Sequence, residues 1–156
     1  MFFIGIITNQ KNELYIRNAL SNFLQEENII FINDKNISNI KNVRFETIII
    51  DYKIDNKQEL RNIISNTKYV ILNSDIETNL EILNDLKLTV ITYGFNNKAT
   101  FTVSSIEENS IIICLQRIIY NKNKEKIEPQ EFEIKCVEGL EKHTNIGISI
   151  LKLIYK

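Results

Sequence analysis

Short apolar runs follow one another along the first 94 residues, with helix-like stretches between them. Phe2 to Ile7 shows no alternation of apolar and polar positions, which is typical of a central parallel strand covered on both faces. Further runs predict four more strands: Asn28 to Ile32, Phe45 to Ile50, Tyr69 to Leu72 and Leu88 to Tyr93. Strands that alternate with helices form β-α-β units with right-handed crossovers. The sequence therefore predicts a doubly wound, mostly parallel α/β sheet.

Three stretches between these runs carry apolar residues at helical spacing. Their inward positions are Ile16, Ala19, Leu20, Phe23 and Leu24 in the first, Leu60, Ile63 and Ile64 in the second, and Ile76, Leu80 and Leu83 in the third. Ser74 and Glu77 have the spacing of a capping box, so we predict that the third helix begins there. Each helix can dock on the sheet by one face and keep its other face in water.

The pattern changes after Gly94. Ala99 to Ile106 and Ser110 to Ile119 lack a helix-length interval between them, which predicts an antiparallel hairpin. Gln130 to Val137 alternates apolar and polar residues, so it should be a half-exposed strand that joins the hairpin. A last helix buries Ile148, Leu151, Ile154 and Tyr155. We therefore expect an antiparallel β extension after the parallel part, followed by a final helix.

Composition supports one domain over residues 1–156, divided into a parallel part (1–94), a β-rich extension (95–137) and a terminal helix (143–156). The chain is 44% hydrophobic, which is enough for one core. Lys and Arg number 19 against 20 for Asp and Glu, so we expect no nucleic-acid partner. The start of the chain has too few apolar residues for a secretion signal or a membrane span. We therefore expect a cytoplasmic protein without membrane contact.

Polar residues follow the predicted strands, where parallel sheets usually bind ligands. The first strand leads through Thr8-Asn9-Gln10-Lys11-Asn12 into a helix, the setting of phosphate-binding loops, because free N–H groups at a helix start attract anions. Asp51 follows the third strand and is a candidate magnesium ligand. The simpler interpretations are an exposed lysine at a helix start and a solvated aspartate in a turn, and both stay open.

The sequence VILNSD, then a helix, then VITYGFNNKATFTVSSI, resembles the second half of the central, ATP-binding domain of Mur ligases and their folylpolyglutamate synthase relatives. His143-Thr144-Asn145 before the last helix resembles the family's His-Asn segment. The loop after the first strand resembles the family's Thr-Asn-Gly-Lys-Thr. The resemblance implies a P-loop-like α/β fold and nucleotide contacts from Thr8, Asn9, Lys11, Asn73, Asp75 and Asn145, with magnesium at Asp51.

The chain departs from this family at the positions that bind phosphate, magnesium and adenine. Gln10 stands in place of the glycine that lets backbone approach phosphate, and Asn12 replaces the magnesium-binding threonine. Ile148 takes the position of the asparagine that contacts adenine. One short helix between Asp51 and Tyr69 replaces the family's long insertion, and the family's two flanking domains have no counterpart in these 156 residues.

We therefore expect no catalytic residues, no cofactor and no enzymatic activity. The resemblance implies a non-catalytic Mur-ligase-like domain that acts through a protein partner or through self-association, with a link to cell-wall synthesis. The alternative is a small ATP-binding protein or phosphotransfer enzyme with a divergent phosphate loop, which would use ATP with magnesium. That alternative places Lys11, Asp51, Asn73 and Asp75 around a phosphate.

Overall fold

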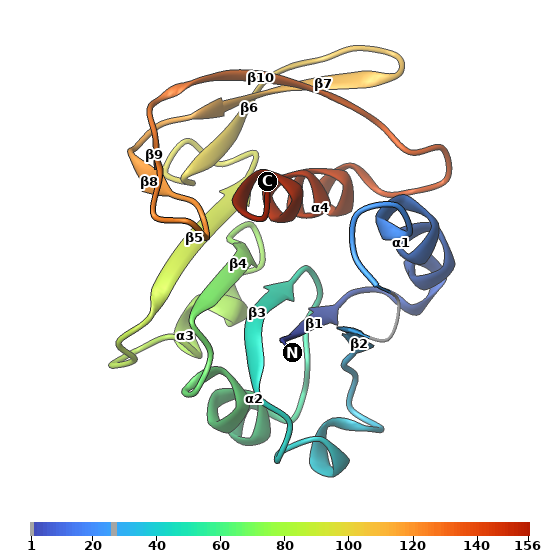
Figure 1. Cartoon of the computed structure of the whole chain (residues 1–156), viewed down its shortest axis with the longest axis vertical. Coiled ribbons are helices and arrows are strands. Elements are labelled where there is room, and N and C mark those ends of the chain that lie inside the picture. The colour runs from blue at the N-terminus through green and yellow to red at the C-terminus, as the bar shows by residue number, and fades with distance from the viewer. Residues whose placement is uncertain (1, 26–27) are drawn as a thin grey trace.

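A mostly parallel sheet of eight strands runs through the molecule (Figure 1). The computed structural model describes residues 2–25 and 28–156, without the side chains of residues 78 and 79. The strands are β1 (Phe3–Ile7), β2 (Ile29–Phe31), β3 (Phe45–Ile50), β4 (Tyr69–Asn73), β5 (Thr89–Gly94), β6 (Phe101–Ile106), β7 (Ser110–Leu115), β8 (Ile119–Tyr120), β9 (Lys126–Ile127) and β10 (Gln130–Lys135). The helices are α1 (Glu13–Leu20), α2 (Lys57–Ile64), α3 (Glu77–Glu81) and α4 (Lys142–Ile154), with short 3-10 turns η1 (Gln10–Asn12) and η3 (Ile37–Asn39).

The strand order is β10-β7-β6-β5-β4-β3-β1-β2. From β1 the chain first moves to β2 at one edge, then returns to β3 on the other side of β1 and continues to β4 and β5, all in parallel. The direction of winding therefore reverses between β1 and β3. In doubly wound sheets, the carboxyl ends of the strands at such a reversal are the usual place for a ligand.

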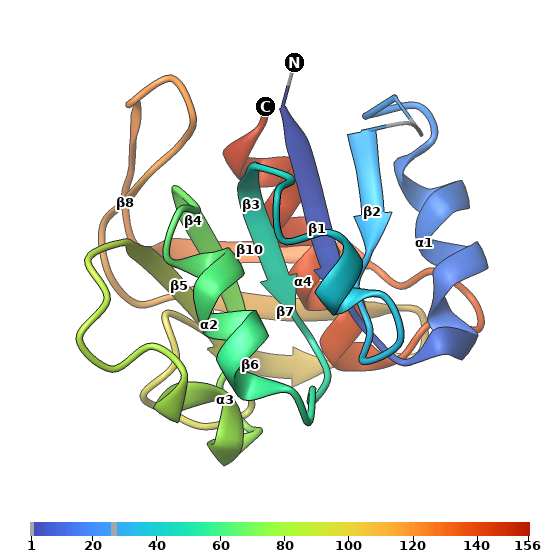
Figure 2. The same ribbon diagram turned by 90° about the horizontal axis from the view of Figure 1, so that it is seen from below.

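Helices cover both faces of the sheet, as Figure 2 shows from below. On one face, α1 and α4 pack on apolar residues of β1, β3, β4 and β5, including Ile4, Ile49 and Ile91. On the other face, α2 packs on Ile48, Ile50 and Val70 and their neighbours. These two cores confirm the predicted α/β class, and both faces of the central strands are buried because their sequences are apolar throughout.

The predicted hairpin is confirmed, and β10 joins it as the edge strand. β6 pairs with β7 and β7 with β10, both antiparallel. The strand predicted over Ser110 to Ile119 is shorter, because β7 ends at Leu115. There the side chains of Gln116 and Arg117 donate to backbone carbonyls of residues 97–99, and β8 turns away to pair with β9.

The third helix differs most from its prediction. It spans only Glu77–Glu81, its N-cap is Ile76, and no side chain caps it. Ser74 does not form the predicted capping box, because its hydroxyl donates instead to the carbonyl of Tyr93 at 3.4 Å. Leu80 is 43% exposed, whereas Ile82 is buried in the core. The spacing of apolar residues predicted a helix in the correct segment, but the helix is shorter than the pattern from Ile76 to Leu83.

None of the helices in the described part of the chain is both long and apolar enough to span a membrane.

Candidate functional site

Polar side chains meet at the carboxyl ends of β1, β3 and β5, against the start of α4. We call this group the carboxyl-edge cluster, and its members are Thr8, Asn12, Asp51, Tyr93, Glu141 and Thr144. Thr8 directly follows β1 and Asp51 directly follows β3. The cluster therefore lies at the reversal point of the sheet, where a ligand site was expected.

Asp51 is the centre of this cluster. Its carboxylate accepts hydrogen bonds from three hydroxyl groups, those of Thr8 at 3.1 Å, Tyr93 at 2.6 Å and Thr144 at 2.5 Å. Asp51 is only 6% exposed. Burial raises the pKa of its carboxyl, and the three hydroxyl donors offset part of that effect. Both carboxylate oxygens are thus bonded to the protein itself.

Tyr93 reaches Asp51 from the inward face of β5. Its side chain is fully buried, and burial together with the neighbouring carboxylate raises the pKa of its hydroxyl well above the usual value. The hydroxyl therefore stays protonated and donates. Gly147 of α4 makes room for it, because a Cβ at this position would lie 2.9 Å from the Tyr93 oxygen.

Asn12 fills the space between the first loop and α4. It is fully buried, and its Nδ2 lies 3.2 Å from Thr8 Oγ1, 3.2 Å from Glu141 Oε2 and 3.3 Å from Thr144 Oγ1. The hydroxyls of Thr8 and Thr144 can accept from this amide because each donates its own hydrogen to Asp51. Asn12, which stands where the Mur ligases have their magnesium-binding threonine, therefore links the first loop to α4 by hydrogen bonds.

Lys11 is held by Glu141. Its Nζ lies 3.0 Å from Glu141 Oε1, at a partly exposed position. The hydrogen bonds from Lys11 and then Asn12 lower the pKa of the Glu141 carboxyl, so it is ionised at neutral pH. A carboxylate thus stands beside the loop that a phosphate would have to approach.

Three backbone N–H groups of this loop already have acceptors inside the turn. The N–H of Lys11 donates to the Asn9 side chain at 3.3 Å, and the N–H of Asn12 donates to the Asn9 carbonyl at 2.8 Å. The N–H of Glu13 donates to the Gln10 carbonyl. Phosphate-binding loops need these groups to point at the anion. Here three successive donors are satisfied within the 3-10 turn η1.

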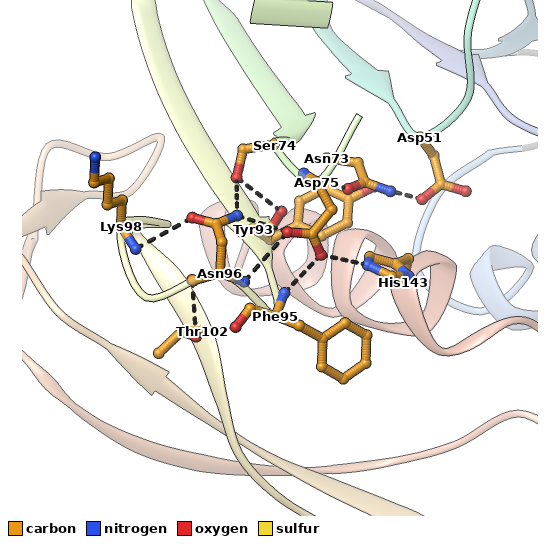
Figure 3. A network of polar contacts seen from close by, with 10 residues as sticks. All are labelled: Asp51, Asn73, Ser74, Asp75, Tyr93, Phe95, Asn96, Lys98, Thr102 and His143. Atoms are coloured by element: carbon orange, nitrogen blue, oxygen red, sulfur yellow. Dashed lines mark hydrogen bonds and ion pairs between the residues drawn. The ribbon is translucent and has the colours of Figure 1, made fainter. Parts of the chain in front are cut away.

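A second polar group, the Asp75–His143 pair, lies next to the cluster (Figure 3). His143 Nε2 lies 2.7 Å from Asp75 Oδ2, and the same carboxylate accepts the backbone N–H groups of Phe95 at 2.7 Å and Asn96 at 3.2 Å. Burial by itself would raise the pKa of Asp75, but these bonds and that of the Asn96 side chain lower it to about 2. The ionised carboxylate can only accept, so His143 Nε2 carries the hydrogen.

The sequence-predicted site residues separate into distinct places. Thr8 and Asp51 come together in the carboxyl-edge cluster, and Lys11 and Asn9 lie in the adjoining turn. Asn73, at the end of β4, is buried and accepts the N–H of Asp75 at 3.0 Å.

Asn145 does not join these residues. Its amide accepts the N–H of Val137 and donates to the carbonyls of Leu140 and Glu141, so it orders the turn before α4.

Four members of the cluster were not predicted as site residues: Asn12, Tyr93, Glu141 and Thr144. Tyr93 was assigned to a buried strand, and a phenol among aliphatic neighbours was the available signal, because a buried hydroxyl needs a partner. Thr144 and Asp51 are 93 residues apart. No spacing rule connects them, since only the docking of α4 brings them together.

A magnesium-bound nucleotide phosphate does not fit the cluster as it stands. Asp51 has both oxygens bonded, Lys11 is paired with an acidic group, and the N–H groups of Lys11, Asn12 and Glu13 donate within the turn. Among the described residues, no three or more His, Cys, Asp or Glu side chains gather into a group that could hold a metal ion. An open cleft of about 280 Å³ lies beside the cluster, between the loops after β1, β2 and β3, and Lys35, Tyr52 and Lys53 line part of it.

A scan against protein-family models finds no match for this chain, and a search of curated proteins finds no similar sequence.

Proposed function

We propose that this chain is a non-catalytic α/β domain, similar to the central domain of Mur ligases, that acts by binding protein rather than by turning over nucleotide. The observation that carries the proposal is the closed state of the carboxyl-edge cluster. Asp51 is bonded to three hydroxyls and Lys11 to Glu141, so the groups that would hold magnesium and phosphate hold each other instead. The link to cell-wall synthesis, which the sequence resemblance implies, and the expected cytoplasmic location belong to the same proposal.

The second candidate is a small nucleotide-binding protein. The cleft beside the cluster favours it, because this cleft lies at the reversal point of the sheet and places the half-exposed ring of Tyr52 beside two lysines, although Glu13 and Asp34 also line it. Such a ligand would contact Lys35 and Lys53 rather than the side chain of Lys11.

Thermal unfolding with and without magnesium-ATP tests both candidates. A ligand at about a hundred times its Kd stabilises by about 2.7 kcal/mol, which raises the Tm of a chain of this size by roughly 5 to 10 °C. The proposed function predicts no rise in the wild type or in Lys11→Ala.

A rise in Tm that Lys11→Ala abolishes would overturn the proposal, because it would show that the loop after β1 binds the nucleotide phosphates. If the rise survives Lys11→Ala and disappears in Lys53→Ala, the nucleotide binds in the cleft and the second candidate holds.

A further inference from the structure

β10 is a free edge strand with its hydrogen-bonding groups turned outward. It ends the eight-stranded sheet and, within the described residues, pairs only with β7 (Figure 1). The N–H of Cys136 donates to the carbonyl of Asn109 at 2.8 Å, just past the end of the β7 ladder. Because antiparallel pairs alternate between bonded and non-bonded residues, Glu131, Glu133 and Lys135 direct their N–H and C=O groups away from β7. An unpaired edge of this kind is a template for another strand.

An apolar groove lies beneath this edge. It has a volume of about 320 Å³ and is lined by Phe132 and Ile134 of β10, by Ile150 and Leu153 of α4, and by Phe23. Glu133, Lys152 and Lys156 are the charged residues of its lining, and lysine stems can lie along apolar surface while their charge stays in water. A strand added to β10 would extend the apolar wall of this groove.

The charges along β10 are self-complementary in one register. A two-fold axis perpendicular to the sheet keeps each side chain on its own face, and isologous pairing makes the same residues meet twice. With the axis at Ile134, Glu133 of one copy lies opposite Lys135 of the other, twice, and the two Ile134 side chains meet at the centre. An axis at Phe132 puts Glu131 opposite Glu133 twice, and an axis at Lys135 brings two lysines together. An axis at Glu133 places Glu131 opposite Lys135 twice, but it also brings the two Glu133 side chains together at the centre. Among these registers, the one centred on Ile134 pairs opposite charges without pairing like charges. Opposite charges facing each other stabilise a strand pair, and like charges destabilise it.

We infer that the partner of this domain is a second copy of the same chain, joined through antiparallel β10–β10 pairing centred on Ile134 to make a continuous sheet across the dimer. The inference rests on the proposed function in one respect, because it names a partner for a domain that acts by binding protein. Alternation places Ile134 and Cys136 of each copy on the groove side of the sheet, where Phe132 and Ile134 already pack on the core. The other sheet edge, β2, has only three residues and offers a much shorter template.

Sedimentation of the full chain tests this inference. The wild type should sediment at twice the chain mass of 18.3 kDa. Glu133→Lys should weaken the dimer by about tenfold or more, because two ion pairs become two like-charge pairs. The double variant Glu133→Lys with Lys135→Glu should restore the dimer, since the same two pairs reform with their signs exchanged.

Glu108→Lys is the matched control, because it makes the same charge change at an exposed position in the turn between β6 and β7 and should leave the dimer unchanged. A monomeric wild type at high concentration, or a dimer that Glu133→Lys does not weaken, would overturn the inference. The outcome is separate from that of the magnesium-ATP experiment. A monomer that does not bind ATP leaves the proposed function with a different partner, and a dimer that does bind ATP removes the proposed function but not the interface.

Discussion

Asp75 and His143 join segments that are 68 residues apart in the chain. The pair ties the end of β4 to the first turn of α4, and the N–H groups of Phe95 and Asn96 add the loop after β5. The ring of Phe95 packs edge-on against His143, with 4.8 Å between centroids. Gly94 permits this arrangement, because a Cβ there would lie 2.7 Å from the Asp75 carboxyl atoms. One carboxylate thus holds three elements together.

The lowered pKa of Asp75 predicts how stability depends on pH. The folded state holds the pKa at about 2, below the usual 3.8, so Asp75 stabilises the fold above about pH 4 and loses this contribution as the pH falls toward 2. The group is partly exposed, so we expect a contribution on the order of 1 kcal/mol. Denaturant unfolding of the wild type and Asp75→Asn should show a gap at pH 6 that closes near pH 2. A gap of constant size across this range would show that the charge of Asp75 does not contribute.

At the scale of elements, α4 completes the carboxyl-edge cluster. The helix contributes Thr144 and packs Gly147 on the hydroxyl of Tyr93. Glu141, the residue before the helix, forms an ion pair with Lys11 and accepts a hydrogen bond from Asn12. Glycine normally weakens a helix interior by about 1 kcal/mol relative to alanine. The close contact with Tyr93 explains why the position accepts that cost.

A double-mutant cycle tests this contact. Gly147→Ala should destabilise the protein by about 1–3 kcal/mol despite the better helix propensity of alanine, because its Cβ would push Tyr93 away from Asp51. In a Tyr93→Phe background the same substitution should cost less, since the nearest atom is the hydroxyl that phenylalanine lacks. Equal costs in the two backgrounds would mean that the helix and the tyrosine are not coupled through this contact.

Burial patterns made most of these elements predictable from the sequence, but not their exact lengths. Apolar runs located β1 to β5, and the alternation of Phe132 and Ile134 located β10, because these patterns follow directly from burial on two faces or on one. The third helix was predicted to include Leu83, but it ends at Glu81. Leu80 fits the helical period and was expected to face inward, yet it is exposed, and Ile82 is buried in its place.

At the scale of the whole molecule, strand order and helix docking carry the information that periodicity lacks. The sequence placed Thr8 and Asp51 after the first and third predicted strands, and the structure brings the two side chains within 3.1 Å, because those strands are neighbours in the sheet. It did not predict that α4 would close over them, because nothing in the spacing of residues 141–145 indicates which strands that helix meets. The sequence therefore predicted loop residues of the site such as Thr8 and Asp51. It did not predict the hydrogen bonds from α4 that close the cluster.

The stability of Asp51→Asn shows whether the carboxyl-edge cluster is closed by bonds within the protein. If Asp51 is a structural acceptor, its replacement should lower the free energy of unfolding by about 1–3 kcal/mol, because three hydroxyls, two of them buried, lose their carboxylate acceptor. Asp85→Asn makes the same chemical change in an exposed turn whose positive φ asparagine also tolerates, and it should change stability by less than about 0.5 kcal/mol. A variant Asp51→Asn as stable as the wild type, or more stable, would contradict the account, because that result is typical of a carboxylate kept for a ligand at the expense of the fold.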